Sequence, residues 1–262
     1  FKLGAVPFHM WVPDVYHGAP TSVAAFVGTA PKIAAVMFAF RILLTGFGEV
    51  HQYWAPMFAV LAVASLVVGN LAAIMQTNIK RMLAYSTVSH MGFILLAFMA
   101  GSIGSTAGLY YAITYALMAA AGFGILMVLS NDNIECEEIK DLAGLNQRHA
   151  WFALLMLLVM FSMAGIPPLM GFYAKFGVIM VLLKFHYVWL SVFAVVMSLI
   201  GAFYYLRVVK VMYFDEPTHD QPIGSNYAAK FLLSVNAFLL VLWGVMPQTM
   251  IDWCAKALEN TL

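Results

Sequence analysis

Charged residues are scarce in this sequence. They make up 10% of its 262 residues, whereas a soluble globular domain carries about 25%. Twelve acidic and thirteen basic side chains cannot coat the surface of a soluble protein of this length. The net charge of +1 is also too small for a typical nucleic-acid-binding protein, which presents a basic surface. These shortages disfavour a soluble enzyme, a disordered chain and a nucleic-acid partner.

Cysteine and the common cofactor motifs are almost missing. The two cysteines, Cys136 and Cys254, lie far apart and have neither metal-ligand spacing nor a disulfide framework. The sequence holds no CxxC, CxxCH, GxGxxG or Walker motif, and no two histidines lie four residues apart. We therefore predict that this chain itself binds no nucleotide, haem, iron–sulfur cluster or metal.

Apolar residues, by contrast, make up 63% of the chain and gather in long runs. Each run is close to or longer than the roughly 20 residues that a helix needs to cross a bilayer. A membrane barrel would instead show strictly alternating strands of about 10 residues. We therefore predict an all-α, polytopic transmembrane helix bundle forming one membrane domain over residues 1–262. The expected helices are 21–44, 54–75, 82–100, 106–129, 151–183, 187–213 and 227–245, with a partial helix near 1–12.

Two of these segments contain features that interrupt helices. A straight helix over 151–183 would measure roughly 50 Å, and Gly165-Ile166-Pro167-Pro168 lies in its middle. Proline removes a backbone donor and clashes with the preceding turn, which predicts a broken helix at Gly165–Pro168. A second break is expected at Val6-Pro7-Phe8-His9. Broken helices at membrane depth are typical of transport sites.

Three lysines stand out because they lie within or next to these segments. Lys32 is at the centre of 21–44, Lys175 follows Pro168 by seven residues, and Lys2 precedes Pro7 by five. All twelve acidic residues lie outside the expected helix cores. A lysine at the bilayer centre costs roughly 2.5–3.5 kcal/mol, and a desolvated amine releases its proton more easily than a hydrated one. We predict that these three lysines transfer protons.

The alternative for a membrane lysine is snorkelling, in which a side chain near a helix end reaches the headgroups. Snorkelling suits Lys184 and Lys210, but Lys32 is too central for it. Because no carboxylate is expected inside these helices, any counter-charge would come from a preceding part of the chain or from a neighbouring subunit. The sequence begins at Phe1 without a signal peptide, and we expect an N-terminal part to be missing.

Histidine and tyrosine supply further candidates for a proton relay. His90 lies well inside 82–100 and is either a relay group or a neutral histidine hydrogen-bonded within the bundle. His9 lies beside Pro7 and either relays protons or supports the break. Tyr85 and the pair Tyr204-Tyr205 either donate to a water chain or serve as packing residues.

The basic residues predict the orientation of the bundle. Connections on one side are richer in lysine and arginine, which places that side in the cytoplasm and the C-terminus on the periplasmic side. The richer side holds Lys80, Arg81, Lys140, Arg148, Arg207, Lys210 and Lys230, and the other holds Arg41, Lys184 and Lys256.

Several motifs, in order along the chain, give a resemblance. The sequence closely resembles the C-terminal half of the bacterial subunit N family of the proton-pumping NADH–quinone oxidoreductase (respiratory complex I). The motifs are FKLGAVPFHMWVPDVY at 1–16, GAPT at 18–21, PKIA at 31–34, QTNIKRMLAYS at 76–86, GIPPLMGF at 165–172 and YYLR at 204–207.

The resemblance implies an antiporter-like fold and a set of roles. Lys2 matches the lysine of the first broken helix, Lys32 the bridging lysine, and Lys175 the terminal lysine of the second broken helix. His9 and Tyr85 match motif positions near the hydrophilic axis, and His90 falls in the same stretch.

The resemblance also implies what surrounds this chain. Its partners would be other membrane subunits of the NADH–quinone oxidoreductase in the bacterial cell inner membrane, the lipid bilayer and the missing N-terminal half of the same subunit. FMN, iron–sulfur clusters and quinone would belong to the partner subunits, so this chain would be a non-redox part of a proton-translocating enzyme.

Two other functions stay open at this point. One is a subunit of a multisubunit cation/proton antiporter, which shares the fold. The other is a structural membrane anchor, against which the three deep lysines argue, because an anchor does not need such costly charges.

Overall fold

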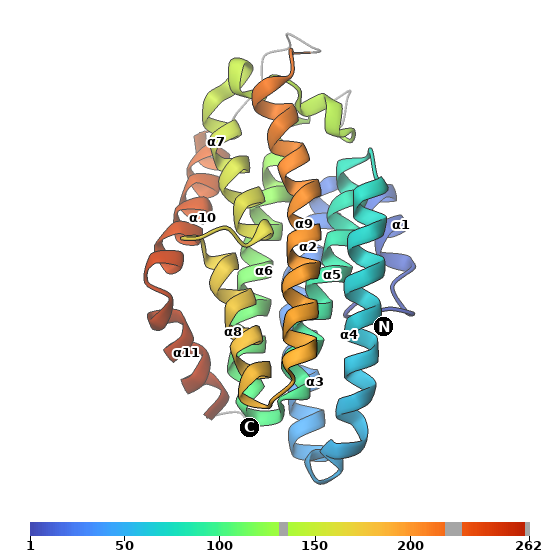
Figure 1. Cartoon of the computed structure of the whole chain (residues 1–262). Helices are drawn as coiled ribbons and strands as arrows, with labels where there is room; N and C mark the ends of the chain where they lie inside the picture. Colours follow the sequence, from blue (N-terminus) through green and yellow to red (C-terminus); the bar gives the residue numbers. More distant parts are fainter. Residues whose placement is uncertain (131–135, 218–226, 260–262) are drawn as a thin grey trace.

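The structure is a computed structural model that describes residues 1–130, 136–217 and 227–259 (Figure 1). Over these residues the chain is a helical bundle without strands, in which an isolated β-bridge joins Asn78 to Glu138. The α-helices are α1 (Trp11–Gly18), α2 (Thr21–Gly28), α3 (Ala30–Arg41), α4 (His51–Met75), α5 (Ile79–Met99), α6 (Gly101–Leu129), α7 (Leu145–Ala164), α8 (Met170–Lys184), α9 (Val188–Phe214), α10 (Tyr227–Val245) and α11 (Pro247–Glu259). A π-helical turn, Ile42–Gly46, and two 3-10 turns, Gly48–Val50 and Ile139–Leu142, complete the described elements.

The helices are long and apolar enough for a membrane protein. Seven segments among the described residues have the length and hydropathy of membrane spans, with mean hydropathies from 1.3 to 2.3. The exposed apolar side chains of the outer helices, such as Leu199 and Phe231, are the surface expected against lipid. The predicted all-α transmembrane bundle is confirmed.

The most buried of the seven spanning segments, α5, lies at the centre of the bundle. α5 packs against α1, α4, α6 and α8, and 94% of its spanning window is buried inside the protein (Figure 1). Its buried residues include Ser86, Thr87, Ser89 and His90. In a bilayer these polar side chains avoid lipid only by facing other helices, and α5 therefore forms a polar axis through the bundle.

Close approach of α4 to α5 depends on Gly69. A Cβ atom added there would lie 2.6 Å from the backbone nitrogen of Ser89 and 2.9 Å from the carbonyl oxygen of Tyr85. Both neighbours are backbone atoms and cannot turn away. The missing side chain thus brings α5 within backbone contact of α4, as small residues do between membrane helices.

The predicted break at Gly165–Pro168 is confirmed. α7 ends at Ala164, Gly165 adopts the left-handed conformation with φ 85°, and α8 begins at Met170. Pro167 and Pro168 have no amide proton to continue the helical pattern. The interruption lies near the middle of the bundle's length, where a turn of chain separates α7 above from α8 below (Figure 1).

Two predicted helices differ in the structure. Residues 1–10 form turns, and helix starts only at Trp11, because Gly4 takes a positive φ of 79° and Pro7 cannot donate a helical hydrogen bond. The segment 21–44 is divided at Thr29, whose φ and ψ of −116° and −96° separate α2 from α3. Pro31 then lies in the first turn of α3, a position that proline tolerates.

Other helix limits differ by about a turn. α4, α5 and α6 begin at His51, Ile79 and Gly101, earlier than expected. α11 was not expected, since its apolar residues lie on one face only. That face buries Met250, Cys254 and Leu258 against the bundle.

Replacement of Gly69 by alanine tests the α4–α5 contact. We expect Gly69→Ala to lower stability by about 1–3 kcal/mol, because the new methyl group meets backbone atoms that cannot move aside. The measurement is thermal unfolding of the purified protein in detergent. Gly177→Ala is the control, because its Cβ would lie 3.9 Å from Ala107, an ordinary contact. Equal stability of both variants would contradict this packing.

Cys136, outside the spanning helices, provides a test by pH. Burial, and then the charge of Asp141, raise the pKa of its thiol from 9.0 to about 12. The thiol therefore stays protonated until far above neutral pH, and at pH 8 its thiolate fraction is about a thousandth of that of an ordinary cysteine. We expect alkylation of the folded protein to be slow from pH 7 to 10 and to recover after denaturation. Equally fast alkylation before and after denaturation would contradict the burial.

Candidate functional site: a row of buried lysines and hydroxyl groups

Lys32 is held inside the bundle by the interrupted N-terminal segment. Its side chain is 1% exposed and lies directly after Pro31, in the first turn of α3. The Nζ atom donates hydrogen bonds to the carbonyl oxygens of Leu3, at 2.7 Å, and Lys2, at 3.3 Å. It also lies 5.2 Å from the centre of the Trp11 ring.

The irregular backbone of residues 1–10 makes this contact possible. In a continuous helix the Leu3 carbonyl would bond to an amide one turn later, but here it faces the lysine. Gly4 lets the segment fold closely over the amine, since a Cβ there would lie 2.7 Å from Val12 and 3.4 Å from Lys32 Nζ. The interruption thus supplies oxygen atoms at the depth of the charge.

Lys175 is held in the same way by the second break. It is buried on α8, and its Nζ donates to the carbonyl oxygen of Ala164 at 2.9 Å and to Ser198 Oγ at 3.0 Å. Ala164 is the last residue of α7, so the break releases its carbonyl from helical bonding. Gly165 leaves room for the lysine, because a Cβ there would lie 3.0 Å from Lys175 Cδ.

Lys32 and Lys175 are therefore stabilised inside the bundle in the same way. Each binds neutral oxygen atoms rather than a carboxylate, and within the described ranges neither forms an ion pair. Such bonds stabilise the ammonium less than a full counter-charge does, while burial destabilises it. Opposed effects of this kind suit a group that gains and loses a proton.

His90 occupies the centre of the polar axis and bonds at both ring nitrogens. Nδ1 lies 2.8 Å from the hydroxyl of Tyr111 on α6, and Nε2 lies 3.0 Å from the hydroxyl of Tyr205 on α9. The Tyr205 hydroxyl also lies 2.5 Å from Ser86 Oγ. Because a neutral imidazole has one donor and one acceptor nitrogen, the tyrosines must face it with opposite polarity. We name Tyr111, His90, Tyr205 and Ser86 the His90 chain.

Two further polar pairs flank the His90 chain. Thr87 lies 2.6 Å from the hydroxyl of Tyr115, whose ring is 5.1 Å from that of His90. On the other side, Tyr204 donates to the Oδ1 atom of Asn70 at 3.1 Å, and its ring lies 4.3 Å from that of Tyr205. All four side chains are buried. The polar groups thus extend through the bundle from α4 to α6 and α9.

The other sequence candidates lie outside this network. The side chain of Lys2 is exposed, although its carbonyl contacts Lys32. His9 is partly buried, and its Nδ1 atom has no hydrogen-bond partner among the described residues. Tyr85 is half-buried on α5, and its hydroxyl bonds to no other residue in the described ranges.

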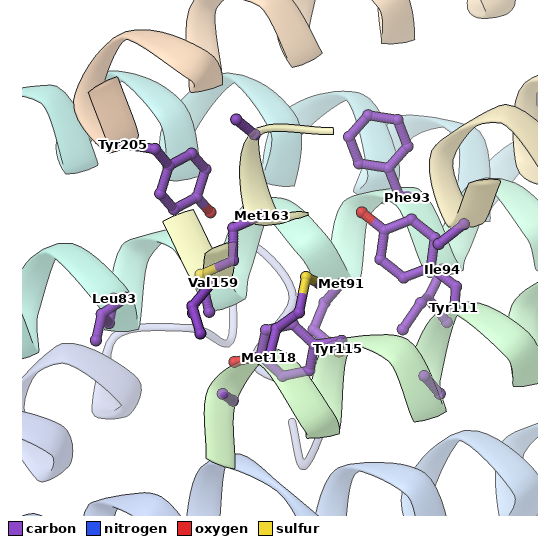
Figure 2. Packing of buried hydrophobic residues seen from close by; sticks show 14 of the residues in the cluster. Leu83, Met91, Phe93, Ile94, Tyr111, Tyr115, Met118, Val159, Met163 and Tyr205 are labelled. Atoms are coloured by element: carbon purple, nitrogen blue, oxygen red, sulfur yellow. The ribbon is translucent and has the colours of Figure 1, made fainter. Parts of the chain in front are cut away.

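Several members of the network were not found from the sequence. Tyr111 and Tyr115 were not singled out, yet their four-residue spacing places both on one face of α6. Ser86 and His90 have the same spacing on α5. These paired spacings are the signal available in the sequence. Figure 2 shows Tyr111, Tyr115 and Tyr205 among the packed apolar side chains that surround them.

One end of the bundle carries a further buried cation besides Lys32 and Lys175. Lys80 is 1% exposed and pairs with Glu137 at 2.9 Å, although the sequence suggested a loop position. Nearby, the guanidinium group of Arg207 donates to the carbonyl oxygens of Ile74, at 2.9 Å, and Gln76, at 2.5 Å. These contacts close the end of α4 where its last carbonyls lack amide partners.

The described residues contain no direct hydrogen bond from Lys32 or Lys175 to the His90 chain. A proton moving between them would need water or side-chain rotation at each gap. Within the same ranges, no three histidine, cysteine, aspartate or glutamate side chains cluster closely enough to hold a metal ion. The arrangement is suited to proton transfer.

Comparison with known proteins gives the family. Residues 1–201 match the family described as NADH:quinone oxidoreductase/Mrp antiporter, TM. A protein of Neisseria gonorrhoeae named NADH-quinone oxidoreductase subunit N is 82% identical over 263 residues, covering 100% of this chain and 55% of that protein. The subunit of the same name from Laribacter hongkongensis is 57% identical, with 100% and 54% covered. The chain spans about half the length of the curated relatives that it matches.

Solved structures have the same fold. A chain of respiratory complex I from Thermus thermophilus with bound aureothin aligns with a TM-score of 0.81 and 30% identity, covering 96% of this chain and 55% of that one. A chain of the Mrp complex from Dietzia sp. aligns with a TM-score of 0.90 at 22% identity, covering 99% and 57%, which shows the fold alone. The resemblance indicated by the sequence motifs is confirmed, and the chain belongs to the NADH:quinone oxidoreductase/Mrp antiporter membrane family.

Proposed function

We propose that this chain is part of a proton-translocating membrane subunit of an NADH–quinone oxidoreductase. The observation that carries the proposal is the pair of buried amines, Lys32 and Lys175, each bonded to carbonyl oxygens at an interrupted helix, with the His90 chain on the axis of the bundle. The names of the relatives from Neisseria gonorrhoeae and Laribacter hongkongensis support the choice of enzyme.

The His90 chain transfers a proton by exchanging its bonds. When one tyrosine donates to the imidazole, the other nitrogen donates to the second tyrosine. A proton arriving at Ser86 moves the Ser86 hydroxyl proton to the Tyr205 oxygen and the Tyr205 hydroxyl proton to Nε2. Nδ1 releases its proton to Tyr111, which gives its own hydroxyl proton onward. The imidazole then carries its proton on the other ring nitrogen, so a flip of the ring together with rotation of the hydroxyl groups restores the starting polarity. The imidazole carries the proton through without leaving its site, which is the role suited to histidine.

The two amines, Lys32 and Lys175, store the proton on either side of the His90 chain. Lys32 holds it against the Leu3 and Lys2 carbonyls, and Lys175 holds it against Ala164 and Ser198. In this proposal Lys2 is the first group to receive the proton. It lines a groove of about 700 Å³ beside Pro31 and Phe38, where another segment or subunit would cover it. His9 and Tyr85 are candidate relay groups at the margin of the axis.

The redox reaction belongs, in this proposal, to partner subunits that hold FMN, iron–sulfur clusters and quinone. Changes of charge in those subunits would be transmitted to Lys32 and Lys175 through neighbouring membrane subunits, so this chain takes no part in electron transfer. We place the protein in the bacterial inner membrane, with Lys80 and Arg207 on the cytoplasmic side and the C-terminus on the periplasmic side.

Replacement of Lys32 tests the proton-transfer role. We expect Lys32→Ala and the more conservative Lys32→Met to reduce NADH-driven proton pumping to about a tenth or less, because each variant removes the group that receives the proton. The measurement is acidification of proteoliposomes containing the intact complex. Lys184→Ala is the control, because Lys184 is exposed at the end of α8.

Full pumping by both Lys32 variants, in a complex that assembles normally, would contradict the proposal. Replacement of Lys2, Lys32 and Lys175 together by methionine separates transport from anchoring. An anchor would lose at most stability after this change, whereas a transport subunit loses pumping.

The alternative is a subunit of a cation/proton antiporter, which the fold of the Dietzia chain makes relevant. We expect proton movement by the complex to require NADH and quinone and to be unchanged when sodium is replaced by choline. The measurement compares pumping in the two salts at equal ionic strength. Sodium-dependent proton exchange without NADH would favour the antiporter instead.

A further inference from the structure

Phe93 lies at the contact between Lys175 and the His90 chain. It follows His90 by three residues on α5 and is 2% exposed. Its ring is stacked on that of Tyr111, with 5.6 Å between the centroids and 16° between the planes (Figure 2). The Nζ atom of Lys175 lies 5.6 Å from the centre of the same ring. Phe93 therefore contacts both an amine and a member of the His90 chain.

The contact with Lys175 depends on charge. An ammonium group has three donors, and two of them bond to Ala164 and Ser198. Within the described residues the third has no acceptor, and the aromatic ring is the remaining partner that attracts a cation. This cation–π attraction exists for the ammonium and vanishes for the neutral amine. Lys175 therefore attracts the Phe93 ring only while its amine is protonated.

The contact with Tyr111 places Phe93 at one end of the proposed proton path. The Tyr111 hydroxyl bonds to His90 Nδ1, so the ring stacked on Phe93 belongs to the end of the His90 chain. Phe93 offers no hydrogen-bonding group, and in the described ranges no hydrogen bond joins Lys175 to Tyr111. The ring that contacts both groups therefore offers no atom that could pass a proton between them.

We propose that Phe93 is the gate of this part of the path, closed by the positive charge of Lys175. The inference rests on the proposed function and adds a residue to it. While Lys175 is an ammonium, its charge holds the ring and no second proton can pass. When Lys175 gives its proton outward, the ring is released and turns. A proton from the His90 chain then reaches the neutral amine through water, the ammonium forms again, and the ring returns.

A fluorinated phenylalanine series at position 93 tests the gate. Fluorine atoms weaken the attraction of a ring for a cation with little change of size. We expect the passive decay of an imposed pH gradient, in proteoliposomes containing the intact complex without NADH, to become faster with each added fluorine. Trifluorophenylalanine should give about a tenfold increase. The control is the same series at Phe98, which is as buried on the same helix but packs on Phe40 at 4.0 Å.

A second pair of variants keeps the test independent of unnatural residues. Phe93→Leu should leak protons, and the leak should disappear when Lys175→Met is added, because the path then lacks its acceptor. An unchanged decay across the series at position 93, or an equal increase at position 98, would overturn the gate. NADH-driven pumping of the unmodified complex is recorded in parallel. Failure of pumping there would count against the proposed function, whereas normal pumping with a flat series would count against the gate alone.

Discussion

A buried ammonium must be surrounded by oxygen atoms, and this chain supplies them from interrupted helices. In an intact helix the interior carbonyls are bonded to amides one turn later and have little left to offer a cation. The irregular segment before α1 frees the carbonyls of Lys2 and Leu3, and the end of α7 frees that of Ala164. Without the two interruptions, Lys32 and Lys175 would be charges in hydrocarbon with almost no compensation.

The rest of the bundle follows from keeping this polar row away from lipid. α5 carries the hydroxyl groups and His90, and its central place hides them behind α1, α4, α6 and α8. Gly69 allows the close approach of α4 to α5, and Asn70 on α4 accepts a hydrogen bond from Tyr204 on α9. The apolar residues lie outside, where they face lipid, so the same distribution of side chains both anchors the protein and encloses the row.

The sequence predicts the parts of this arrangement that depend on local chemistry. Pro167 and Pro168 in an overlong apolar run indicate the break, and the position of Lys32 within a span indicates a functional charge. The interruption at Thr29 was missed because Pro31 is compatible with the first turn of a helix, and its presence does not locate the break. Similarly, the apolar content of residues 1–10 suggested a partial helix, but Pro7 and the positive φ of Gly4 prevent it.

The hydrogen-bonded network could not be predicted, because its partners are distant in sequence. The two tyrosines that bond to His90 are 21 and 115 residues away. Tyr205 was singled out as a possible donor to a water chain, but the sequence does not show that either tyrosine meets His90. Periodicity shows which residues share a face of one helix, but not which faces meet.

The central claim is that these amines belong to a hydrated path. It is tested most directly by a map of the intact assembly at a resolution that shows ordered water. We expect water within hydrogen-bonding distance of Lys32 and Lys175, leading toward Thr87 on one side and ending at Phe93 on the other. Lysines enclosed by apolar side chains or turned to the headgroups, with no water beside them, would contradict it.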